Sequence, residues 1–177
     1  EFHHGISNRL TGNGFSCLQN AEQMGEGWSD WASLVTTVEV GDQGADKRGI
    51  GTYALYQDAD GVGIRSYPYS TDMSINPKVF ADVAANQEVH AFGEVWAEMV
   101  WDLYWAMVEK YGWDADLTNT NSGNFRDIQL VVDGMKYQPC GPGFQDGRDG
   151  IMLADMLNYD GVDTCLISTV FARRGLG

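Results

Sequence analysis

The 177-residue sequence has few basic residues, few cysteines and no long apolar run. Eleven lysine and arginine residues stand against 25 aspartate and glutamate residues, which gives a formal net charge of -14. A surface of that charge repels phosphate groups, so we expect neither a nucleic acid nor a membrane as a partner. Because no apolar run reaches bilayer length, we also expect no transmembrane helix. The acidity suits a secreted, extracellular protein but does not select a function.

Three cysteines allow at most one internal disulfide and leave at least one thiol over. Cys140 and Cys165 flank a segment with a helical pattern, so we predict that these two residues pair. Cys17 then carries a free thiol or pairs with a cysteine outside this sequence. The chain also opens on Glu1 without an initiator methionine, and we therefore expect a processed or truncated piece of a longer protein.

Helical patterns dominate the sequence. The clearest one covers residues 88–111, where large apolar residues recur at spacings of three and four and acidic residues lie off that stripe. Further helices are predicted over residues 1–11, 21–40, 122–137, 145–158 and 163–174.

One small β element interrupts this pattern. Residues 52–57 and 62–67 are aromatic and β-branched and flank a DADG turn, which predicts a β-hairpin. We see no linker that would split the chain. The sequence therefore predicts a mainly α fold in one unit, residues 1–177, with one β-hairpin.

The first residues with recognisable chemistry stand at the start of the chain. In a zinc-protease helix of the H-E-x-x-H type, two histidines bind zinc and the glutamate acts as general base. Glu1 and His4 have the spacing of that glutamate and the second histidine, while the first histidine would precede Glu1. This match is weak by itself. Glu26 offers a third ligand, and Asp30, four residues on, could accept a hydrogen bond from a zinc-bound histidine.

These residues belong to a series of motifs that make the chain similar to the fungalysin family of metallopeptidases, secreted relatives of thermolysin. The motifs stand in the family's order and span nearly the whole chain. They are residues 1–12 (EFHHGISNRLTG), 24–30 (MGEGWSD), 63–70 (GIRSYPYS), 88–96 (EVHAFGEVW), 138–140 (QPC), 148–149 (RD) and 174–177 (RGLG).

The resemblance implies the helical C-terminal lobe of a thermolysin-like metalloprotease, with the N-terminal lobe and the first zinc histidine absent. The implied activity is zinc-dependent hydrolysis of peptide bonds in protein or peptide substrates, with the missing N-terminal lobe as a partner. The implied roles are Glu1 as general base, His4 and Glu26 as zinc ligands, Asp30 behind them, His90 as hydrogen-bond donor to the oxyanion, and Arg65 on a substrate carbonyl.

A zinc site of this class needs three protein ligands, and this chain supplies two. We therefore expect the isolated chain to bind zinc poorly and to hydrolyse little. Two alternatives stay open, a non-catalytic extracellular remnant and a calcium-binding structural module. Residues 58–61 begin like a calcium loop, but no glutamate follows at its twelfth position, which favours a turn. Glu88 is interpreted as a helix-start acid without a function.

Overall fold

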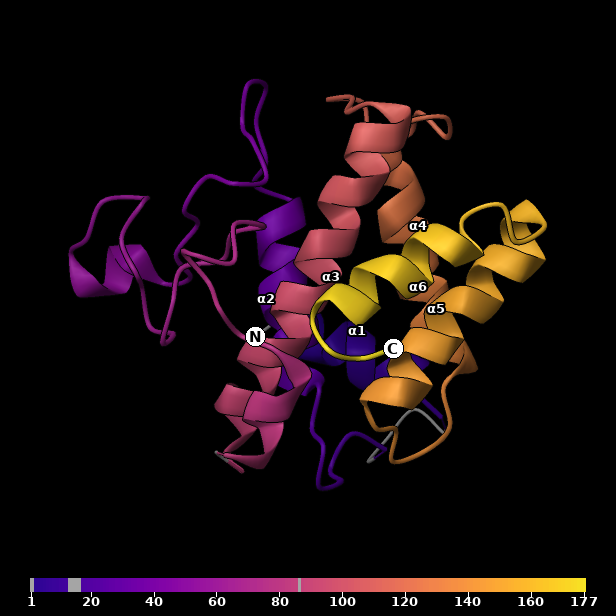
Figure 1. The fold of residues 1–177 in the computed structure, drawn as a ribbon, viewed down its shortest axis with the longest axis horizontal. Helices are drawn as coiled ribbons and strands as arrows, with labels where there is room; N and C mark the ends of the chain where they lie inside the picture. Colours follow the sequence, from indigo (N-terminus) through magenta and orange to yellow (C-terminus); the bar gives the residue numbers. More distant parts are fainter. Residues whose placement is uncertain (1, 13–16, 86) are drawn as a thin grey trace.

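The computed structural model describes residues 2–12, 17–85 and 87–177, which form six α-helices joined by loops (Figure 1). A mainly α fold is thereby confirmed, and each helix lies close to a predicted range. No helix in the described ranges is long and apolar enough to cross a membrane. The helices are α1 (Phe2–Leu10), α2 (Gly25–Val35), α3 (Val89–Tyr111), α4 (Gly123–Tyr137), α5 (Phe144–Tyr159) and α6 (Thr164–Arg173), with the short 3₁₀ helices η1 (Thr52–Leu55) and η2 (Phe80–Ala84) between α2 and α3.

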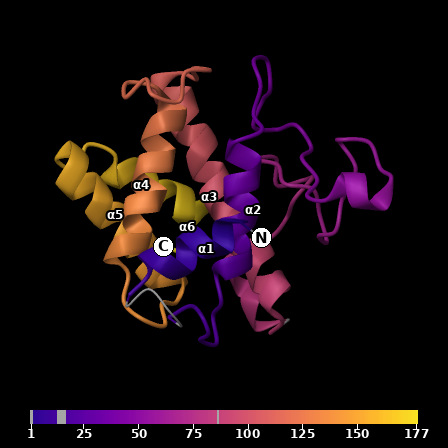
Figure 2. The same cartoon turned by 180° about the vertical axis from the view of Figure 1, so that it is seen from behind.

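Helix α3 is the centre of the molecule, and α2, α4 and α6 pack against it (Figures 1 and 2). Trp96 and Trp101 are both fully buried, although they lie on different sides of the helix. The ring of Trp28 from α2 meets Trp96 edge-on at 4.9 Å, and Phe144 from α5 does so at 5.1 Å. Because neighbours cover several faces of α3, this one helix organises the whole apolar core.

Two glycines set how closely α2 approaches α3. A Cβ atom on Gly27 would lie 2.6 Å from the carbonyl oxygen of Gly93, and one on Gly93 would lie 2.5 Å from the Cβ of Glu26. The two backbones are therefore in direct contact where the helices cross. Since Glu26 adjoins Gly27 and His90 lies one turn before Gly93, the crossing brings the first turns of both helices together.

The acidic residues of α3 do not form a solvent-exposed face. Glu94, Glu98 and Asp102 are each at most 6% exposed, and they recur every four residues on one side of the helix. Glu94 accepts a hydrogen bond from the backbone amide of Ser66 at 2.5 Å, and Glu98 accepts one from the side-chain amide of Asn76 at 2.5 Å. These carboxylates hold the loop that precedes η2 against α3.

Arg174, which follows α6, balances this buried negative charge. Its fully buried guanidinium lies 2.9 Å from Glu98 and 2.7 Å from Asp102, and it also donates to backbone carbonyls within residues 70–78. Breaking such a buried pair by removing one partner costs about 3–5 kcal/mol. Arg174 therefore holds the loop that carries Arg65 against α3.

The predicted β-hairpin is wrong. Residues Thr52–Leu55 form η1, and the described residues on either side of it contain isolated bridges rather than a ladder of paired strands. Gly51 (φ 71°) and Tyr56 (φ 55°) take left-handed conformations that close a tight turn at both ends of η1. Tyr53 and Tyr56 are 93% and 99% exposed, so the aromatic residues that suggested a strand do not pack in a sheet.

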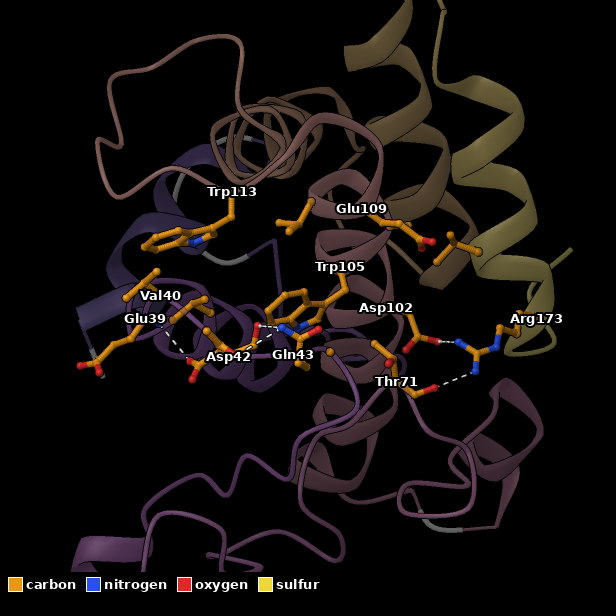
Figure 3. Close-up of a pocket in the computed structure, with 16 residues that line it drawn as sticks. Glu39, Val40, Asp42, Gln43, Thr71, Asp102, Trp105, Glu109, Trp113 and Arg173 are labelled. Carbon is orange, nitrogen blue, oxygen red and sulfur yellow. Dashed lines mark hydrogen bonds and ion pairs between the residues drawn. The ribbon is translucent and has the colours of Figure 1, made fainter.

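A cavity of about 650 Å³ lies beside the C-terminal half of α3 (Figure 3). Residues 38–44, which follow α2, form one wall, and Val170 and Arg173 of α6 contribute to another. Trp105 and Trp113 add aromatic surface to the lining. The cavity lies between the loop of residues 38–44, whose turns are closed by hydrogen bonds such as that from the Asp42 amide to the Glu39 carbonyl, and the side of α3 that carries Trp105.

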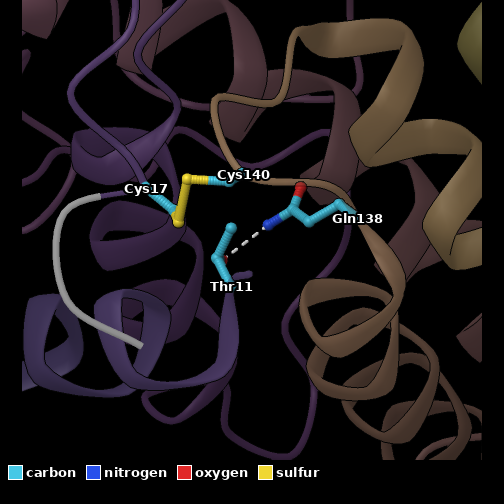
Figure 4. Close-up of a disulfide and its surroundings, with 4 residues drawn as sticks. All are labelled: Thr11, Cys17, Gln138 and Cys140. Carbon is cyan, nitrogen blue, oxygen red and sulfur yellow. Dashed lines mark hydrogen bonds between the residues drawn. A yellow bond between two sulfur atoms is a disulfide. The ribbon is translucent and has the colours of Figure 1, made fainter. Parts of the chain in front are cut away.

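The predicted Cys140–Cys165 disulfide is also wrong. Cys17 is bonded to Cys140 (Figure 4). Cys165 has an exposed free thiol. Cys140 and Cys165 lie beyond opposite ends of α5, whose 16 residues span about 24 Å. The amide of Gly141, by contrast, donates to the carbonyl of Cys17 and holds the two loops together. The disulfide closes a loop of 123 residues, and such links contribute about 2–4 kcal/mol.

We predict that Gly27→Ala lowers the free energy of unfolding by about 1–3 kcal/mol, because the new methyl group overlaps the carbonyl oxygen of Gly93. Gly5→Ala in α1 is the matched control, because a Cβ atom there meets nothing within 4 Å. Alanine has the higher helix propensity, so Gly5→Ala should leave stability unchanged or raise it by up to about 1 kcal/mol. Urea unfolding measures both values, and equal effects of the two substitutions would contradict the close crossing.

Candidate metal centre

Helices α1 and α2 bring His4 and Glu26 together. The Nε2 atom of His4 lies 3.3 Å from Oε1 of Glu26, and the two side chains are 29% and 24% exposed. Each residue lies in the first turn of its helix, and α1 packs against α2. The two residues that the sequence suggested as ligands are therefore neighbours at an accessible position.

The distance between these two atoms fits a shared zinc ion. Zinc binds histidine nitrogen and glutamate oxygen at about 2.0–2.2 Å in a tetrahedral arrangement, which separates two donor atoms by about 3.3–3.5 Å. Within the described ranges, no group of three or more histidine, cysteine, aspartate or glutamate side chains is placed to hold a metal ion. The predicted general base Glu1 lies outside the described residues. The structure thus offers two donor atoms, and a complete site needs a third.

Arg65 contacts Glu26 from the other side. Its Nη2 atom lies 3.2 Å from Oε2 of Glu26, which leaves Oε1 facing His4. Its Nε and Nη2 atoms also donate to the two carboxylate oxygens of Asp30, at 2.6 and 2.9 Å. Burial alone would lower the pKa of Arg65, but the hydrogen bond and charge of Asp30, together with the hydrogen bond to Glu26, outweigh it and raise the pKa. The guanidinium therefore stays charged and fixes the orientation of the Glu26 carboxylate.

Asp30 links this arginine to a buried phenol. The hydroxyl of Tyr69 donates to Oδ2 of Asp30 at 2.6 Å, and both side chains are buried. Burial raises the pKa of Tyr69 well above its ordinary value, and the charge of Asp30 adds to that rise. Tyr69 therefore remains a hydrogen-bond donor. Asp30 as the partner of a zinc-bound histidine stays a prediction, since its hydrogen bonds within the described part of the chain go to Arg65 and Tyr69.

His90 approaches the same carboxylate oxygen from α3. Its Nε2 atom lies 3.6 Å from Oε1 of Glu26, and its Nδ1 atom lies 2.5 Å from Oε1 of Glu88. The other oxygen of Glu88 accepts hydrogen bonds from the backbone amides of His90 and Ala91 and so caps α3. The hydrogen bond to His90 lowers the pKa of Glu88. Glu88 thus orients His90, a role that the sequence interpretation missed although the E-x-H spacing at a helix start could have indicated it.

An open depression of about 540 Å³ lies next to these side chains. Arg65 and His90 both line it, together with Ile64, Ser66, Glu88, Ala91 and Glu94. The two residues that the sequence placed around a substrate therefore share one concave surface. Their contacts with a substrate carbonyl and with an oxyanion stay predictions.

Comparison with known proteins gives a consistent result over the full sequence. The family model described as fungalysin metallopeptidase (M36) matches residues 1–177. The chain is 39% identical to the extracellular metalloproteinase mep of Aspergillus fumigatus, 39% identical to the extracellular metalloproteinase MEP of Pyricularia oryzae and 37% identical to extracellular metalloproteinase 2 of Arthroderma otae. Each comparison covers 100% of this chain and 29% of the relative. The chain belongs to the fungalysin family of metallopeptidases.

Proposed function

We propose that the protein containing this chain is a secreted, zinc-dependent endopeptidase. The observation that carries the proposal is the 3.3 Å separation of His4 Nε2 and Glu26 Oε1. Family membership and the names of the relatives, which are extracellular metalloproteinases, support the activity and the location. One imidazole nitrogen and one carboxylate oxygen form a donor pair that suits zinc.

His4 and Glu26 hold the metal in this proposal, and the third ligand is the first histidine of the H-E-x-x-H motif, which would precede Glu1. When bound, the ion supplies a Lewis acid that lowers the pKa of water and polarises a carbonyl. Glu1 accepts a proton from the water that attacks the peptide carbonyl and passes it to the leaving amine. The substrates are proteins or peptides that lie in the depression beside His90.

His90 and Arg65 act on the substrate from the walls of that depression. Glu88 holds the ring of His90 through Nδ1, and we assign to its Nε2 the hydrogen bond to the carbonyl oxygen as negative charge develops. Within the described residues the hydrogen bonds of Arg65 use Nε and Nη2. Its Nη1 is therefore the atom that we assign to a substrate carbonyl.

We predict that Arg65→Lys weakens the zinc affinity of the intact protein about 10- to 100-fold. A single ammonium group cannot hold Asp30 and Glu26 in the geometry of the guanidinium. Arg48→Lys is the matched control, since Arg48 pairs with Asp42 outside the metal centre. Competition with a chelating zinc indicator measures both affinities, and thermal unfolding of the zinc-free proteins checks the fold. Equal zinc affinity in the Arg65→Lys variant and the unmodified protein would contradict the orienting role.

We predict about one zinc ion per chain in the intact protein. Both the metal and the cleavage of a fluorogenic peptide should be lost in His4→Ala and Glu26→Gln. His3→Ala is the matched control, because the neighbouring His3 lies against the apolar groove of Trp28 and Ile6. Elemental analysis and the peptide assay give the two readouts, and full activity of His4→Ala would refute the proposed ligand.

The two alternatives give different results in the same experiments. A non-catalytic remnant would hold no zinc and cleave no peptide in the intact protein. A calcium-binding module, with zinc stripped, would gain thermal stability on calcium addition to the same extent in His4→Ala and in the unmodified protein. Residues 58–61, whose sequence begins like a calcium loop, form a turn that is closed by the hydrogen bond from the Gly61 amide to the Asp58 carbonyl at 2.9 Å. This conformation agrees with the turn that the sequence favoured at these residues.

A further inference from the structure

The cavity beside the C-terminal half of α3 (Figure 3) and the candidate metal centre are lined by different residues. His4, Glu26, Arg65 and His90 are not among the residues that line it. Its volume of about 650 Å³ lies within the range of about 300–1,000 Å³ that is typical of ligand sites. The cavity is therefore large enough to hold a side chain together with part of the adjoining backbone.

Trp105 lies in the centre of the lining, between residues 38–44 and the Asp102–Arg173 pair (Figure 3). A Cβ atom on Gly44 would lie 2.8 Å from the indole ring, so the backbone of the loop packs in close contact with Trp105. Within the described part of the chain, its buried indole N–H has no hydrogen-bond partner. Because that N–H is shielded from solvent, a ligand in the cavity meets the indole ring, whose face suits a cation.

The charge of the lining is negative even after its internal ion pairs are taken into account. Four carboxylates line the cavity, and Asp42 and Asp102 already have arginine partners. Glu39 and Glu109 are exposed and form no ion pair with any of the described residues. The net charge of -14 adds a long-range attraction for cations. The lining thus has uncompensated acidic groups on both sides of the aromatic surface.

We propose that this cavity binds an arginine or lysine side chain of a polypeptide, as a docking site that is independent of the metal centre. The cationic head lies between Glu39 and Glu109 and over the faces of Trp105 and Trp113. The aliphatic stem contacts the apolar part of the lining at Val40. A site of this kind favours basic proteins over acidic ones as ligands.

The test compares two small ligands in an NMR titration of the intact protein. They are Nα-acetyl-arginine N-methylamide and the corresponding citrulline compound, which keeps the shape of arginine and loses its charge. The arginine compound should bind at least about fivefold more tightly, and added salt should reduce the difference. Equal affinities of the two compounds would overturn the proposal.

Substitutions locate the binding. Trp113→Leu and Glu109→Gln should each weaken binding of the arginine compound about three- to tenfold. The matched controls are Tyr53→Leu and Asp60→Asn, which remove an exposed aromatic ring and an exposed carboxylate outside the cavity and should change nothing. If Trp113→Leu fails to fold, Glu109→Gln at the helix surface tests the charge alone. Unchanged affinity in Glu109→Gln would overturn the proposal.

A chelator distinguishes this site from the proposed peptidase centre. Removal of the metal should leave binding of the arginine compound unchanged, whether or not the protein is a peptidase. Loss of binding together with the metal would place the ligand at His4 and Glu26 and would overturn the separate site.

Discussion

The backbones of α2 and α3 are in direct contact at Gly27 and Gly93, and this contact sets the distance between the two helices. Without side chains at these two positions the helices cross closely enough to set Glu26 beside the first turn of α3. His90 then faces the carboxylate oxygen that also faces His4. If α2 and α3 lay farther apart, the histidines would be separated from Glu26. The geometry of the candidate metal centre therefore depends on how the core packs.

Buried charge provides the second level of organisation. The carboxylates of Glu94, Glu98 and Asp102 would be costly inside a helical core without partners, and Arg174 and the loop amides supply those partners. Burial still raises the pKa of Glu98 against the charge of Arg174. The loop held in this way delivers Arg65 to Glu26. The ion pairs and hydrogen bonds that compensate the buried charge therefore also help to orient Glu26, a proposed metal ligand.

The helices were predictable because local signals agree with the tertiary structure. Helix α3 has an apolar repeat, an acidic cap at Glu88 and a glycine at its end, so its limits follow from local chemistry. The acidic residues within it were misleading: a stripe at helical spacing indicates one face, but only the tertiary structure shows that the loop and Arg174 cover that face. The hairpin failed for a related reason, since aromatic residues at 53 and 56 indicate strand only where a partner strand packs against them.

The sequence indicated which residues belong to the candidate site, but it indicated few of the contacts between them. The E-x-x-H spacing and the GEGWSD segment indicated His4 and Glu26, which the fold brings together. The links from Arg65 to Glu26 and Asp30 depend on how distant segments meet, which no spacing encodes. The link from Glu88 to His90 is local, and the E-x-H spacing at the start of α3 could have indicated it. The disulfide shows the same limit: sequence proximity favoured Cys165 for Cys140, whereas the folded loops place Cys17 beside it.

We propose that His4 and Glu26 share a metal ion while Arg65 holds the other oxygen of Glu26. Anomalous X-ray scattering at the zinc edge, from crystals of the zinc-loaded intact protein, tests it most directly. We expect one strong peak within about 2.0–2.2 Å of both His4 Nε2 and Glu26 Oε1, with the Arg65 guanidinium still bonded to Oε2 of Glu26. A zinc peak at the Cys165 thiol instead, or a zinc ion bound to His4 with both Glu26 oxygens turned to Arg65, would contradict it.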